Sequence, residues 1–120
     1  MNQDPSPRRY DLEERTLRSA KDVIGFTGTL PKSVANSEIA RQVIRSSGSV
    51  GANYIEANEA LSRKDFAMRV RICRKEARET GYWLRLLELS GDGAEGTRQS
   101  LIAEATELTK IFSSIAEKAR

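Results

Sequence analysis

The chain has 120 residues, of which 38% are hydrophobic and 31% charged, and its formal net charge is +3. This size fits one domain with one core, and the charged fraction suits a helical bundle with solvated outer faces. Histidine is absent and Cys73 is the single cysteine, which excludes imidazole bases, Ser-His or Cys-His nucleophile pairs, disulfides within the chain, and histidine or multi-thiolate metal sites. No signal peptide and no membrane-spanning apolar run is visible, so we expect a cytoplasmic protein with no cofactor, no metal and no membrane contact.

Residues 1–9 include Asp4-Pro5-Ser6-Pro7 and are expected to form a disordered leader. The first helix is predicted from near Tyr10 to about Gly28, because Leu30-Pro31 follows and the residue before a proline disfavours the helical conformation. Its inward face is predicted from apolar and small residues at helical spacing: Leu12, Leu17, Ala20, Val23, Ile24 and Thr27.

The second helix is predicted from Asn36 or Ser37 to about Ala60. Its apolar or small arc comprises Ile39, Val43, Ile44, Ser47, Val50, Gly51, Tyr54, Ile55 and Leu61. Gly48 and Gly51 each weaken a helix by roughly 1 kcal/mol relative to alanine. They indicate either a break near residues 46–48 or the close approach of a neighbouring helix. We favour the close approach, because the apolar pattern keeps its phase across both glycines.

A polar stripe runs along the same helix at steps of three and four residues. Its members are Gln42, Arg45, Ser49, Asn53 and Glu56. The stripe predicts a polar network between helices or a lined interface between subunits. Carboxylate metal sites in bundles use Glu-x-x-His motifs, and this chain has no histidine. Glu76 and Glu79 of the next helix are therefore expected to pair with Arg45 or Arg69. Ser49 and Asn53 are expected to complete this network. Removing Arg45 from a buried pair is predicted to cost about 3–5 kcal/mol; the alternative is a surface Arg45 that contacts phosphate, whose removal lowers only nucleic-acid affinity.

The third helix is predicted from Arg63 to about Ser90, with Gly91-Asp92-Gly93 ending it. Ser62 is expected to cap it, with Asp65 at the third position and a hydrophobic staple between Leu61 and Phe66. The predicted core stripe comprises Phe66, Val70, Cys73, Ala77, Thr80, Leu84 and Leu87. Cys73 is therefore expected to be a buried structural residue rather than a reactive thiol.

The outer side of this helix carries two further arcs at 100° per residue. The cationic arc comprises Arg63, Lys64, Arg71, Arg74, Lys75, Arg78 and Arg85. It fits phosphate contacts along a nucleic acid; the alternatives are a solvated face or pairing of Arg71 or Arg78 with Glu104 or Glu107. Stacking on single-stranded bases is not expected, because few aromatic residues are interleaved. The apolar arc comprises Met68, Ile72, Trp83 and Leu86. It predicts a subunit contact; the alternative is packing within one chain, because a central helix touches two neighbours.

The fourth helix is predicted from Arg98 to about Ala119, with Thr97 as its cap. Its inner face comprises Leu101, Ala105, Leu108, Ile111, Phe112 and Ile115. Four amphipathic segments with short connections predict an all-α fold, an antiparallel up-down-up-down four-helix bundle over residues 10–120.

The stretch from Gln42 to Ala57 resembles the signature of the small bacterial four-helix-bundle proteins called 23S rRNA-intervening-sequence proteins. The resemblance continues through Ser62, Asp65-Phe66, residues 75–80 and residues 82–84, and includes no catalytic motif. It implies a bundle that assembles as a homopentameric barrel. A similar fold serves as the accessory protein of diversity-generating retroelements, where a basic pentamer contacts a reverse transcriptase and nucleic acid.

These patterns together predict a non-enzymatic, homo-oligomeric bundle that binds RNA or DNA mainly through phosphates. Two alternatives stay open at this stage. The protein is a protein–protein adaptor whose cations only maintain solubility, or it is an accessory protein of a reverse transcriptase.

Overall fold

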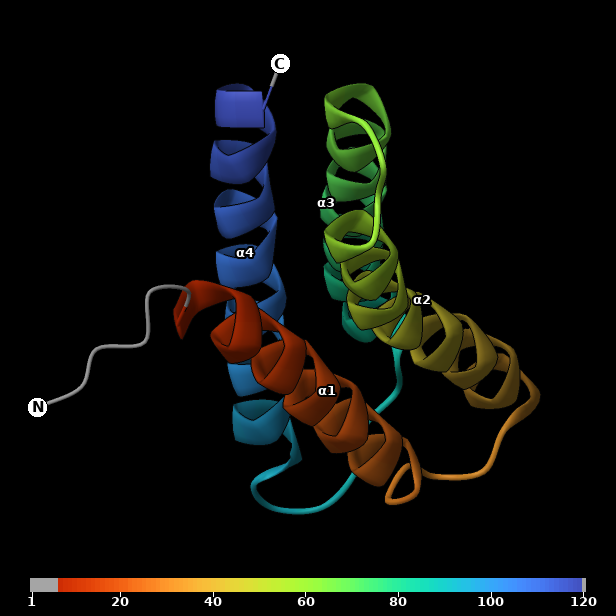
Figure 1. Cartoon of the computed structure of the whole chain (residues 1–120). Helices are drawn as coiled ribbons and strands as arrows, with labels where there is room; N and C mark the ends of the chain where they lie inside the picture. Colours follow the sequence, from red (N-terminus) through yellow and green to blue (C-terminus); the bar gives the residue numbers. More distant parts are fainter. Residues whose placement is uncertain (1–6, 120) are drawn as a thin grey trace, which may run out of the picture.

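The structure is a computed structural model that describes residues 7–119, and within them every regular element is a helix (Figure 1). The helices are α1 (Pro7–Thr27), α2 (Val34–Asn58), α3 (Arg63–Leu86) and α4 (Ala94–Ala119). The all-α fold with four helices is therefore confirmed. Residues 1–6 of the expected leader lie outside the described residues. The helix α1 begins at Pro7, three residues before its predicted start.

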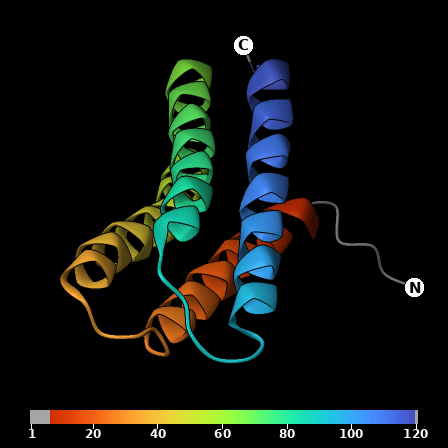
Figure 2. The same cartoon turned by 180° about the vertical axis from the view of Figure 1, so that it is seen from behind.

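Each helix packs against its neighbour in sequence, and α1 also contacts α4. Among residues 7–119, no close backbone contact joins α1 to α3 or α2 to α4. The helices α3 and α4 lie side by side, while α1 runs alongside α2 and crosses α4 obliquely (Figures 1 and 2). The molecule measures 44 × 35 × 19 Å, so its thinnest dimension is about two helix diameters. This flat arrangement leaves the outer side of α3 uncovered.

The core consists of two clusters. One contains Tyr54, Val70 and Phe112, with the two aromatic rings 5.5 Å apart. The other contains Val43 and Leu84, both fully buried. The predicted core stripes of α3 and α4 are confirmed: buried are Val70, Cys73, Ala77, Thr80, Leu84, Leu87, Leu101, Ala105, Leu108 and Phe112, and half-buried are Phe66, Ile111 and Ile115. Each large apolar side chain buried in this way stabilises the fold by about 1.5–3 kcal/mol.

The predicted inward face of α1 is wrong in part. Leu17 is 49% exposed and Ile24 is 52% exposed, whereas Thr16 and Phe26 are buried. Since α1 packs along α2 and only crosses α4, a narrow stripe of the helix is covered. The Thr16 hydroxyl fits this stripe because it donates to the carbonyl of Leu12 at 2.7 Å. Burial of a small polar residue with its own acceptor is invisible to a hydrophobicity pattern.

The two glycines of α2 behave differently. The helix is continuous across both, so the predicted absence of a break is confirmed. A Cβ at Gly51 would lie 2.8 Å from the Oγ1 atom of Thr16, whereas a Cβ at Gly48 would meet nothing within 4 Å. The close approach of a neighbouring helix is therefore correct for Gly51, where α1 packs, and wrong for Gly48.

The starts of α2 and α3 are fixed by serine caps. The Ser33 hydroxyl accepts a hydrogen bond from the backbone N–H of Asn36 at 3.0 Å, so α2 starts earlier than predicted. The Ser62 hydroxyl accepts from the N–H of Asp65 at 3.0 Å, which confirms the predicted cap of α3. The expected staple is wrong, because Leu61 is 98% exposed and does not pack on Phe66.

The end of α3 lies four residues before its predicted position. Leu87 adopts an extended conformation and its side chain is buried. The side chain of Asn36 then holds the backbone of Glu88 through two hydrogen bonds of 2.9 Å, and the Arg98 guanidinium donates to the Leu87 carbonyl at 2.8 Å. Tertiary hydrogen bonds thus end the helix before the glycines do.

The start of α4 also differs from the prediction. The helix begins at Ala94, after Gly91 and Gly93, which have φ values of 90° and 85°. These left-handed conformations are those that glycine adopts most readily. Thr97 therefore lies inside the first turn, where its hydroxyl donates to the Gly93 carbonyl at 3.3 Å, and is not the N-cap.

Candidate nucleic-acid interface

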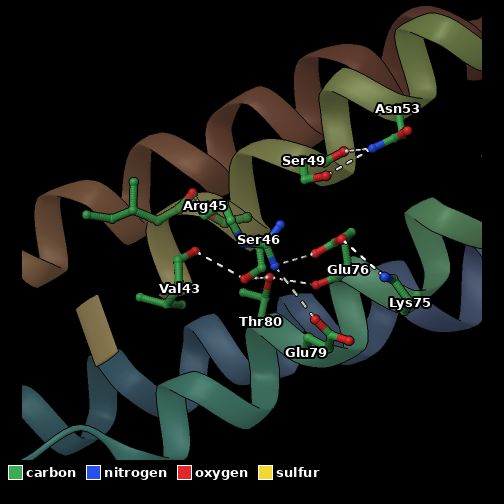
Figure 3. A network of polar contacts seen from close by, with 11 residues as sticks. Val43, Arg45, Ser46, Ser49, Asn53, Lys75, Glu76, Glu79 and Thr80 are labelled. Carbon is green, nitrogen blue, oxygen red and sulfur yellow. Dashed lines mark hydrogen bonds and ion pairs between the residues drawn. The ribbon is translucent and has the colours of Figure 1, made fainter. Parts of the chain in front are cut away.

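The contact between α2 and α3 contains a charged pair (Figure 3). An Arg45 nitrogen lies 3.1 Å from a Glu76 oxygen and 3.8 Å from a Glu79 oxygen. The Glu76 side chain is only 6% exposed, and the Lys75 ammonium lies 3.7 Å from its second oxygen. The expected pairing of Arg45 with Glu76 is thus present, and it joins two helices of one chain.

The rest of the polar stripe divides into separate groups. Asn53 donates to the backbone and the hydroxyl oxygen of Ser49, both at 2.9 Å, and accepts from Arg69 at 3.0 Å. Arg69 therefore bonds to an amide instead of a carboxylate. Gln42 is half-buried and Glu56 is exposed. Neither of these two side chains has a hydrogen bond or ion pair with another residue of the described range.

A buried pair of hydroxyl groups lies beside this network, and the sequence did not predict their contact. The oxygens of Ser46 and Thr80 are 2.8 Å apart, and both side chains are almost completely buried. Thr80 also bonds to the Glu76 carbonyl at 2.8 Å. The apolar pattern predicts Thr80 in the core stripe of α3. A hydroxyl residue at a core position on each of two adjoining helices is the signal that predicts such a pair.

Cys73 is fully buried, and its thiol lies 3.4 Å from the Val50 carbonyl as a hydrogen-bond donor. Burial raises the pKa of Cys73 to about 12. The protonated thiol is therefore favoured over the nucleophilic thiolate at neutral pH, as expected for a structural core residue. In residues 7–119, no group of three or more acidic, cysteine or histidine side chains is placed to hold a metal ion.

The cationic arc of α3 forms an exposed surface, which we call the basic face. It comprises Arg63, Lys64, Arg71, Arg74, Lys75, Arg78 and Arg85, all exposed except the half-buried Arg74. Apart from Lys75, no member forms an ion pair with any residue that the structure describes. Glu104 binds Arg15 at 2.6 Å instead of Arg71 or Arg78. Within residues 7–119, the other six cations therefore have no anionic side chain that an external anion would have to displace.

Two shallow grooves border the basic face. The first, of about 690 Å³, lies along the outer side of α3 and is lined by Arg71, Arg74, Lys75 and Arg78, with Glu79 as its one carboxylate. The second, of about 440 Å³, lies between α3 and α4. Its charged lining residues are Arg78, Arg85 and Lys110, without a carboxylate among them. Lys110 of α4 was not predicted, because the bundle's helix packing is what brings it beside α3.

The predicted apolar arc of α3 is partly covered. Met68 is 45% exposed and Leu86 is 44% exposed, while Ile72 and Trp83 are intermediate. The Trp83 ring packs against the core cluster that contains Leu84, so it contributes to the fold of the single chain.

No helix within residues 7–119 combines the length and the hydropathy needed to cross a bilayer.

The comparisons with known proteins agree with this architecture. The family described as 23S rRNA-intervening sequence protein matches residues 8–114. A crystal structure of a protein of unknown function from the S23 ribosomal protein family of Bacteroides thetaiotaomicron has 30% sequence identity and a TM-score of 0.75, and the match covers 91% of this chain and 97% of that chain. No curated protein matches the sequence. The chain therefore belongs to the 23S rRNA-intervening sequence protein family.

Proposed function

We propose that this protein is a non-enzymatic, cytoplasmic, homo-oligomeric bundle that binds RNA or DNA through the basic face of α3. The observation that carries the proposal is the state of the cations on that face. Six of the seven have no anionic partner among the described residues, although acidic residues are abundant in the chain. Cations held on one rigid helix without internal partners are suited to the regularly spaced phosphates of a nucleic acid.

The charge distribution supports the same reading. Between Arg63 and Glu79 the chain has seven cationic and three anionic residues, a net charge of +4. The whole chain carries +3, so the remaining residues together carry −1. Positive charge is thus concentrated on one helix instead of being spread over the surface. A concentrated charge attracts a polyanion much more strongly than the same charge dispersed.

We further propose that the antiparallel bundle is the repeating unit of a ring, with a pentamer as the expected number. Exposed apolar residues occur on α3, at Met68 and Leu86, and separately on α1 and α2, at Leu17, Ile24 and Ile55. Two different apolar surfaces suit a head-to-tail interface, and such an interface forms a ring when the rotation between successive subunits closes. A ring would repeat the basic face, so that several weak phosphate contacts act together.

The assembly is tested by analytical ultracentrifugation at micromolar concentration. We expect sedimentation well above the 13.4 kDa of one chain, and a shift toward smaller species for Leu86→Glu, at a residue that lines neither groove of the basic face. A matched control is Val34→Glu, at an exposed residue that belongs to neither apolar surface. A monomeric wild-type protein would contradict the proposal.

Nucleic-acid binding is tested by titrating fluorescent RNA and DNA oligonucleotides at low salt. Replacing Arg71, Arg74 and Arg78 together by glutamine should weaken binding about tenfold or more, whatever the sequence of the probe. The control variant Arg18→Gln/Lys21→Gln/Arg41→Gln removes the same charge from exposed positions on α1 and α2 and should retain most of the affinity.

The adaptor function is the second candidate, because Met68, Ile72 and Tyr82 line the same groove as the cations. A mixed apolar and cationic surface also suits an acidic protein, and a reverse transcriptase is one candidate partner. Full affinity in the triple α3 variant, or no binding by the wild type at low salt, would favour the adaptor.

A further inference from the structure

Tyr82 lies between the two grooves of the basic face. Its side chain is 56% exposed, and it lines both the groove on α3 and the groove between α3 and α4. At 100° per residue, Tyr82 falls about 100° from Arg63, within the arc of the cations. Base stacking was not expected from the sequence because few aromatic residues are interleaved with the cations, and Tyr82 is one that is.

The Tyr82 ring is held in place from within the protein. It makes an edge-type contact with Trp83, with ring centroids 5.2 Å apart and planes at 72°. Trp83 in turn packs against the core cluster of Leu84 and Leu87. An exposed aromatic ring supported by a half-buried neighbour loses little conformational freedom when a ligand covers it, so more of the contact energy remains for binding.

Cations flank the ring on both sides. Arg78 precedes Tyr82 by four residues and Arg85 follows it by three, so both lie next to it on the helix surface. Six cationic side chains and one carboxylate line the two grooves. From Arg71 to Arg85 this surface extends along the helix for about 21 Å at 1.5 Å per residue. That length accommodates several consecutive phosphates along α3, most of them on the Arg78 side of the ring.

A tyrosine ring in such surroundings distinguishes unpaired from paired nucleotides. The faces of bases in a duplex are covered by their neighbours, and phosphate contacts alone fit a duplex equally well. An unpaired base has a free face, and aromatic side chains bind it by stacking without regard to sequence. The position of an exposed aromatic ring among phosphate-binding cations is the arrangement that single-strand binding proteins use.

We propose that Tyr82 stacks on a base of single-stranded RNA or DNA whose phosphates lie along the two grooves beside it. This inference rests on the proposed nucleic-acid function and specifies its ligand as an unpaired strand. Arg71, Arg74, Arg78 and, from α4, Lys110 bind phosphates on one side of the ring, and Arg85 binds them on the other.

The test compares oligo(U) and oligo(dT) of about 12 nucleotides, within the usual range of single-strand sites, with a duplex of equal length. Tyr82→Leu should weaken binding to the single strands about tenfold and leave duplex binding unchanged. Tyr82→Phe keeps the ring and should retain the wild-type affinity. Neither variant removes a charge, so the salt dependence of binding should stay the same.

Other results separate the two proposals. If the wild type binds none of the probes at low salt, the proposed function fails, and this inference fails with it. If the wild type binds but Tyr82→Leu has no effect, or an equal effect on duplex and single strand, the inference alone is overturned. A change in the sedimentation of Tyr82→Leu would place Tyr82 in a subunit contact and would also overturn it.

Discussion

The two sides of α3 differ in how their charges are paired. The inner side has a buried ion pair, and the outer side has exposed cations without an ion-pair partner among the described residues. On the inner side, Glu76 is 6% exposed and has Arg45 and Lys75 within 4 Å. On the outer side, Arg71 and Arg78 are exposed and have no ion-pair partner within the described part of the chain. The same helix therefore holds a charge that needs its partners and charges that have none. Composition alone does not separate these roles, whereas position around the helix does.

The difference follows from solvation. A buried carboxylate has lost its water and becomes costly when its partner is removed. An exposed guanidinium keeps its water, so it needs no partner for stability and remains available to a ligand. Substitutions on the inner side should therefore change the free energy of unfolding, and substitutions on the outer side should change binding.

The largest effect on stability is expected for Arg45→Ala. This substitution leaves the Glu76 carboxylate buried without its closest partner, and should lower the free energy of unfolding by about 2 kcal/mol. The cost is below the 3–5 kcal/mol of a fully buried pair, because the Arg45 side chain is 53% exposed and Lys75 remains 3.7 Å away. Urea denaturation measures the change, with the exposed Arg41→Ala on the same helix as the control.

A matched pair of glycine substitutions gives the next largest effect. Gly51→Ala should destabilise the protein by about 1 kcal/mol, because its Cβ would lie 2.8 Å from the buried Thr16 hydroxyl. Gly48→Ala meets no such neighbour and should stabilise the helix by up to about 1 kcal/mol. Both are measured by thermal melting. Thr16→Ala should relieve the loss in Gly51→Ala, and equal effects of the two glycine substitutions would contradict the close contact of α1 with α2.

The Cys73 thiol provides a smaller effect that depends on pH. Because burial raises its pKa from 9.0 to about 12, the folded chain binds one more proton than the unfolded chain between these values. The stabilisation from the protonated thiol is therefore complete below pH 9 and is lost as the pH rises toward 12. The native protein should react with a thiol reagent at pH 8 only on unfolding, and rapid labelling would contradict the burial. Cys73→Ala should show a weaker loss of stability above pH 9.

The smallest effect on stability is expected on the outer side of α3. Replacing Arg71, Arg74 and Arg78 by glutamine should change the free energy of unfolding by less than about 0.5 kcal/mol, because no described residue pairs with them. Urea denaturation beside Arg45→Ala measures this contrast. A loss as large as that of Arg45→Ala would show that the outer cations hold the fold, and the distinction between the two sides of α3 would fail.

The predictable part of the fold is the part that follows from periodicity. The core stripe of α3, with Val70, Cys73 and Leu84, and the cap at Ser62 depend on local spacing and were correct. The errors have tertiary causes. Leu17 was placed inward although the crossing of α1 buries Thr16 instead, and α3 ends early because the distant Asn36 binds the backbone of Glu88.

The candidate site shows the same limit. The cations of the basic face could be predicted, because their positions around one helix follow from the sequence. The position of Tyr82 among them follows in the same way. Lys110 could not be predicted, because it reaches this surface only when α4 packs beside α3. The sequence likewise indicated that Arg45 would pair with a carboxylate, but only the packed helices show that Arg69 binds Asn53.

The most direct test of the proposed function is the salt dependence of single-strand binding. The slope of log affinity against log salt counts the phosphates that the protein neutralises, at about 0.7 for each on a single strand. The Arg71→Gln/Arg74→Gln/Arg78→Gln variant should have a slope flatter than the wild type by about 2, and the Arg18→Gln/Lys21→Gln/Arg41→Gln control should keep the wild-type slope. Equal slopes for all three proteins would contradict phosphate binding by the basic face.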